Sequence, residues 1–100
     1  MEHTSLREKA DELQKNDRVA VELEDCSLEG TVCKSNRGGI RVLPEGGDRL
    51  YVIKTSGAVS STHPDGGALR TDRAVGRAES VEAVGSGSVE YDQREGWVHA

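Results

Sequence analysis

The spacing of apolar residues changes along the chain, and this change predicts the elements. Near the N-terminus, apolar residues recur at intervals of four and three, as on one stripe of a helix: Leu6, Ala10 and Leu13. Ser5 and Glu8 fit a capping box, in which each side chain bonds to the backbone amide of the other residue. We therefore expect a helix over residues 5–15, which must dock on another element because about three turns are marginal alone.

From residue 18 onward the apolar period is two, which is typical of strands with one buried face. Val19, Val21 and Leu23 alternate with small or polar residues. Glycine, asparagine and proline then separate further short apolar runs, as turn residues separate strands. The pattern predicts strands over about residues 18–24, 28–34, 40–43, 49–54 and 74–84.

Two segments lack this alternation. Residues 55–68 are mostly small and polar, which predicts a long mobile loop with little to bury, and extension of a strand into it at Val59 is the alternative. The Gly-Ser run that begins at Gly85 is typical of a linker. We expect residues 1–84 to form a single small domain, because so short a chain cannot build two cores. Residues 85–100 are expected to be a linker and C-terminal tail, with an added strand as the alternative.

These elements predict a mainly β (α+β) fold, in which an N-terminal helix precedes a small five- or six-stranded antiparallel barrel or curled sheet. Residues 19–25, Val-Ala-Val-Glu-Leu-Glu-Asp, and then Gly30-Thr31-Val32 resemble the first strand pair of Sm-like and related SH3-like small barrels. The resemblance implies that Gly30 lets a long second strand bend. It does not extend to the RNA pocket, because residues 36–39, Asn-Arg-Gly-Gly, stand where the Asp-x-x-x-Asn signature would be sought.

The composition predicts a thin core. Only 34% of the residues are hydrophobic, and the chain has no phenylalanine and one tryptophan. Such a core gives modest stability unless a partner or salt adds to it. Arginine outnumbers lysine nine to four and acids exceed bases, a balance that resembles the proteins of salt-loving archaea.

The net charge of -5 is unevenly distributed. Counted by segment, it is -5 over residues 1–33, +4 over residues 34–77 and -4 over residues 78–100. An acidic chain with a basic middle argues against gross attraction to nucleic acid but leaves room for a local anion-facing patch. The candidate nucleic-acid-binding residues are Arg37, Arg41 and Arg49. The alternative is scattered charge that keeps a small protein soluble.

The two cysteines do not predict a metal site. Cys26 and Cys33 are separated by six residues with no second cysteine pair, which is not a zinc pattern. We expect free thiols, as in cytoplasmic proteins, and a disulfide across a hairpin is the alternative.

No catalytic group emerges from the sequence. Ser60, Ser61 and His63 could imitate a nucleophile and its base, but they fall in the predicted mobile loop, which lacks the rigid support that proton transfer needs. The other histidines, His3 and His99, lie near the two termini. We expect no enzyme activity, no bound metal and no cofactor.

The remaining features favour a binding protein. Tyr91 and Trp97 are the largest apolar side chains, and they either fill the core or meet a partner. The apolar stretches are far shorter than the about 18 residues of a membrane span, and no signal peptide is recognisable, so we expect a cytoplasmic protein without a membrane partner.

The function that the sequence favours is a non-catalytic small-barrel module. It would bind a protein partner or form a homo-oligomer, through a sheet edge or its helix. The alternative is an RNA- or DNA-associated module that uses the basic segment over residues 34–77.

Overall fold

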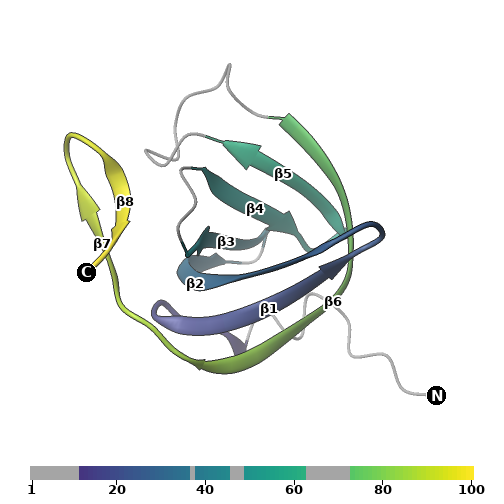
Figure 1. Ribbon diagram of the computed structural model, residues 1–100, viewed down its shortest axis with the longest axis horizontal. Coiled ribbons are helices and arrows are strands. Elements are labelled where there is room, and N and C mark those ends of the chain that lie inside the picture. Colours follow the sequence, from purple (N-terminus) through teal and green to yellow (C-terminus); the bar gives the residue numbers. More distant parts are fainter. Residues whose placement is uncertain (1–11, 37, 46–48, 63–72) are drawn as a thin grey trace.

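A computed structural model describes residues 12–36, 38–45, 49–62 and 73–100. Six antiparallel strands close into a barrel in chain order, and two further strands form a separate sheet (Figure 1). The strands are β1 (Asp17–Leu23), β2 (Ser27–Asn36), β3 (Gly39–Pro44), β4 (Leu50–Lys54), β5 (Ala58–Thr62), β6 (Arg73–Ser86), β7 (Val89–Asp92) and β8 (Gly96–His99). The expected small antiparallel barrel is confirmed, with six strands.

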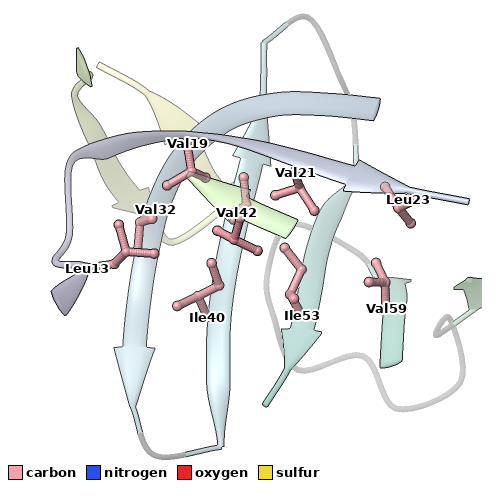
Figure 2. Close-up of a cluster of buried hydrophobic side chains, with 10 residues drawn as sticks. Leu13, Val19, Val21, Leu23, Val32, Ile40, Val42, Ile53 and Val59 are labelled. Carbon is pink, nitrogen blue, oxygen red and sulfur yellow. The ribbon is translucent and has the colours of Figure 1, made fainter. Parts of the chain in front are cut away.

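The alternation in β1 produces the interior of the barrel. Its valines at 19 and 21 are fully buried, and β1 closes the ring by pairing with β2 on one side and β6 on the other. Figure 2 shows the apolar side chains that converge inside from the different strands. The interior cluster consists of Leu13, Val19, Val21, Leu23, Val32, Ile40, Val42, Ile53, Val59 and Val81.

Two features of β2 shape the barrel wall. A Cβ added to Gly30 would lie 2.5 Å from the Leu43 carbonyl oxygen, so this glycine permits the close approach of β3. The register shifts between Val32 and Lys34, which is a β-bulge. The bulge leaves Cys33 and Lys34 together beside Arg41 of β3.

The prediction of a loop over residues 55–68 is wrong for β5, which occupies residues 58–62. This strand pairs with β4 on one edge and β6 on the other. Val59 and Ser61 are only 2% and 4% exposed. Pairing on both edges gives hydrogen-bond partners to the backbone N–H and C=O groups of this segment. Its small side chains show no apolar alternation that would have predicted the strand. Residues 63–68 lie outside the described residues.

In the C-terminal segment, which the sequence predicts as a linker and tail with an added strand as the alternative, residues 89–99 form a hairpin whose two strands pair with each other and not with the barrel. The hairpin β7–β8 packs on the outer surface of the barrel, at the end of the long strand β6 (Figure 1). It covers a second apolar cluster, formed by Cys33, Leu43, Leu50 and Val89 with the partly buried Trp97.

Asn16 fixes the position of the hairpin. Its backbone is left-handed, with φ at 79°. Its amide donates to the Val32 carbonyl at 2.9 Å, and its carbonyl accepts from the Gly87 amide at 2.7 Å. Its side-chain Oδ1 accepts from the Val89 amide at 3.0 Å. One residue therefore joins β2 to the link between the barrel and the hairpin.

The predicted N-terminal helix lies largely outside the described residues. Within the described part of that segment, only Glu12 is helical, and Lys15 and Asn16 form a turn. Leu13 is 6% exposed and joins the barrel interior. Across the described residues, no helix has the length and apolar character needed to cross a membrane.

Candidate binding surface

One outer side of the barrel is basic. Between Gly30 and Pro64 the sequence contains only two acids, and both fall between β3 and β4. The outward positions bring together a set that we call the basic face: Lys34, Arg41, Val52 and Lys54. Arg41 pairs with Lys34 across β2 and with Val52 across β4. The two lysines are exposed, whereas Arg41 and Val52 are half-buried.

A second outer side is acidic, and we call it the acidic face: Ala20, Glu22, Glu79 and Glu82. Ala20 of β1 is half-buried and pairs with the exposed Glu82 of β6. The exposed Glu22 lies two residues further along β1. Among the described residues, neither Glu22 nor Glu82 forms an ion pair.

Arg18 does not neutralise this face. Its guanidinium lies 3.2 Å from the Glu29 carboxylate and 2.9 Å from that of Glu45, so its charge is engaged at the edge of the face. Such partly exposed pairs contribute little to stability, about 0–1 kcal/mol. The cation pairs with these two carboxylates and not with Glu22, so the carboxylates of the acidic face keep their negative charge.

The two faces lie on opposite sides of the barrel. In the closed order, two strands separate β1 from β4 in either direction around the ring. The acidic face is built on β1 and β6 and the basic face on β2, β3 and β4, so the barrel carries opposite charges on opposite walls. The net charge of -5 conceals this separation.

The structure separates the arginines that the sequence grouped. Arg41 lies on the basic face, but Arg49 precedes β4 and binds β5. The Arg49 side chain donates to the Ser61 Oγ at 3.0 Å and to the Ser61 carbonyl at 3.1 Å. Arg37 lies outside the described residues. The register instead places Lys34 and Lys54 near Arg41. Strand alternation could have found Lys54, which lies two residues after Val52, whereas Lys34 reaches this face only through the bulge in β2.

The two hairpin aromatics have different environments. Trp97 packs on the second apolar cluster, and the Lys15 Nζ lies 5.4 Å from its ring centroid, within cation–π range. Tyr91 is 52% exposed and meets the Trp97 ring edge-on, with centroids 5.5 Å apart. Trp97 therefore anchors the hairpin, whereas Tyr91 offers an aromatic surface to solvent.

The two thiols also differ. Cys26 is exposed, whereas Cys33 is buried beneath the hairpin, and both are free. Burial raises the pKa of the Cys33 thiol to about 12, although the positive charges of Lys15 and Arg41 act in the opposite direction. Because the thiolate is the reactive form, Cys33 is protected both by cover and by its protonation.

We predict that one thiol of the native protein reacts readily with a disulfide reagent and the other reacts only after unfolding. Cys26 supplies the fast thiol, and Cys33 supplies the slow one. Thiol counting on protein purified without reductant, before and after adding denaturant, measures both. Two fast native thiols, or none after denaturation, would contradict the arrangement.

Alkaline pH should weaken the fold through Cys33. Its pKa is about 12 in the folded protein against 9.0 for a thiol exposed to water, so its stabilising contribution is complete below pH 9 and is lost as pH rises toward 12. Between these values the free energy of unfolding should fall by about 1.4 kcal/mol per pH unit from this group. Urea unfolding at several alkaline pH values measures the fall. A Cys33→Ala chain lacks this component, so an equal pH dependence in both chains would refute the assignment.

In the described part of the chain, no three histidine, cysteine, aspartate or glutamate residues gather as metal ligands would. His99 Nε2 lies 3.0 Å from the Pro44 carbonyl oxygen and joins the hairpin to the end of β3. No known protein family, no curated protein and no solved structure matches this chain.

Proposed function

We propose that this protein is a non-catalytic binding module that docks another protein, or a second copy of itself, through the basic face. The observation that carries the proposal is the segregation of charge onto opposite walls of a closed barrel. Each strand of the barrel pairs on both sides, so a face is better suited to docking than a strand edge.

The basic face has the properties of a small contact surface. Its cations lie on neighbouring strands, with no acid on β3, β4 or β5 to offset them. Clustered charge of one sign raises the local potential and steers an oppositely charged partner toward it. The half-buried Val52 among these cations adds apolar area that desolvates on contact. These features favour an acidic protein surface as the partner, with binding that weakens in salt.

A glutamate-rich peptide tests this proposal, because it presents the carboxylates of an acidic protein surface without other binding features. We expect a fluorescently labelled peptide to bind the protein at low salt, and Lys54→Glu to weaken that binding by about tenfold or more. The matched control is Arg94→Glu, which changes the net charge equally at an exposed residue in the β7–β8 turn. Fluorescence anisotropy measures both affinities.

Two results would refute the proposal. The first is absence of peptide binding at low salt, where electrostatic attraction is strongest. The second is equal weakening by Lys54→Glu and Arg94→Glu, which would show a response to net charge instead of the basic face.

A second candidate function is binding of single-stranded nucleic acid. The exposed Tyr91 favours this function, because its ring contacts Trp97, over which the Lys15 ammonium lies. Both aromatics belong to the hairpin that covers Cys33, and Cys33 lies at the margin of the basic face. Single-strand binders combine cations for the backbone with aromatic rings on which bases stack. The described residues offer few such rings, so this candidate ranks second.

Titration of labelled single-stranded RNA and duplex DNA distinguishes the two candidates. If nucleic acid is the ligand, affinity falls by about 0.7 log unit per phosphate contact for each log unit of salt on single strands. Tyr91→Ala and Arg41→Ala should both weaken it. Micromolar or tighter RNA binding that these variants lose would reverse the ranking, and no binding at low salt would remove nucleic acid from consideration.

A further inference from the structure

We infer that the partner of the basic face is the acidic face of a second copy of this chain. The inference rests on the proposed function and makes it specific. It depends on the layout of charged residues on the two faces as well as on their opposite signs.

The two faces share one layout. The centre of each face is a half-buried apolar residue. One charged residue lies two positions further along the same strand, and another lies directly opposite on the neighbouring strand. On the acidic face, Ala20 has Glu22 along β1 and Glu82 across on β6. On the basic face, Val52 has Lys54 along β4 and Arg41 across on β3. Strand geometry makes the spacings equal, at about 7 Å along and about 5 Å across.

The handedness of the two layouts is opposite, as face-to-face contact requires. Successive barrel strands are antiparallel, so β1 and β4 run in opposite directions around the ring. In the order of the ring, Arg41 lies on β3, the strand that precedes β4. Glu82 lies on β6, the strand that precedes β1 because the ring is closed. Viewed from outside with both central strands pointing up, Glu82 and Arg41 therefore lie to opposite sides. Two surfaces that face each other match when their patterns are mirror images.

Contact between the faces consequently satisfies three pairs at once. When Val52 of one copy lies on Ala20 of the next, Lys54 meets Glu22 and Arg41 meets Glu82. Arg41 already has an interaction within its own chain, and its positive charge also attracts Glu82 in this contact. Lys54 and Glu22 are both exposed, so they form the pair most accessible to test.

Docking of this kind produces open chains. The two faces lie on opposite walls of each barrel. When two copies dock, the acidic face of one copy and the basic face of the other therefore remain free. A head-to-tail contact that does not close into a ring extends without limit. At about 0.1 M salt the Debye length of about 10 Å screens the repulsion between acidic copies, and at about 1 M it falls to about 3 Å and weakens the contact itself.

Charge exchange at one pair tests the inference through native mass. We expect the unmodified protein to show an average mass that rises with concentration at about 0.1 M salt and falls toward the monomer at about 1 M. Lys54→Glu alone and Glu22→Lys alone each place like charges in contact and should weaken association by about tenfold or more. The double variant Lys54→Glu/Glu22→Lys, and an equimolar mixture of the single variants, restore opposite charges and should recover association.

The controls separate this contact from general charge effects. Arg94→Glu and Glu95→Lys change net charge equally at exposed hairpin positions and should leave the mass unchanged. The mismatched double variant Lys54→Glu/Glu95→Lys should fail to recover association. Recovery in that variant, or no recovery in the matched double variant, would overturn the pairing of residues 54 and 22.

The outcomes also distinguish this inference from the proposed function. A chain that stays monomeric at every concentration, yet binds the glutamate-rich peptide through Lys54, would refute self-association and leave the docking module standing. A chain that neither associates nor binds the peptide would refute both.

Discussion

Replacing Gly39 with alanine is expected to remove much of the stability of the barrel. Gly39 begins β3 with φ at 140°, a backbone conformation that is essentially restricted to glycine. A Cβ there would overlap the Ile53 carbonyl oxygen of β4 and lie 2.9 Å from its carbon. Backbone strain and overpacking each cost about 1–3 kcal/mol, so we expect a combined loss of about 3–5 kcal/mol. That loss is a large part of the total free energy of unfolding expected for a domain with a thin core.

Urea unfolding of Gly39→Ala beside Gly85→Ala isolates the steric part. Gly85 also has a positive φ, of 157°, but a Cβ there would meet nothing within 4 Å. Gly85→Ala should therefore lower the free energy of unfolding only through backbone strain, without the steric overlap. Equal losses in the two variants would show that β3 and β4 are not as close at Gly39 as the structure places them.

Replacing Trp97 with alanine is expected to release the hairpin and expose Cys33. Trp97 is the largest side chain that covers the second apolar cluster, and removing a partly buried indole should cost about 2–3 kcal/mol. The reaction of Cys33 with a disulfide reagent should then accelerate by about tenfold or more, because a small loss of docking energy raises the open population steeply. Stopped-flow or manual thiol kinetics measures the change.

Tyr91→Ala is the matched control for this experiment. Tyr91 touches the edge of the Trp97 ring but is 52% exposed, so its loss should leave the hairpin docked and Cys33 slow. A Cys33 rate that is unchanged by Trp97→Ala would show that the hairpin does not protect the thiol.

The barrel was predictable wherever one face of a strand is apolar. Val19 and Val21 alternate with small or polar residues in β1, so burial of one side follows from the period alone. β5 escaped prediction because Ser60, Ser61 and Thr62 carry little apolar signal, and its stability comes from pairing with strands on both edges. Such pairing depends on distant residues and leaves no local pattern.

The candidate surface was predictable only in part. The sequence showed a basic middle segment, but proximity along the chain grouped Arg41 with Arg49, which instead binds Ser61. Lys54 joins Arg41 through the register of β3 and β4, and the bulge in β2 brings Lys34 beside them. The opposition of the two charged walls is a consequence of ring closure, which no local pattern reports.

The most direct test of the docking module is to locate the contact by NMR, with the glutamate-rich peptide titrated into isotope-labelled protein. The predicted result is a set of amide shift changes confined to the basic face and its immediate neighbours on β2, β3 and β4, lost in Lys54→Glu and kept in Arg94→Glu. Shift changes centred on β1 and β6, or none at a peptide concentration that saturates the anisotropy signal, would contradict the assignment of this face as the docking surface.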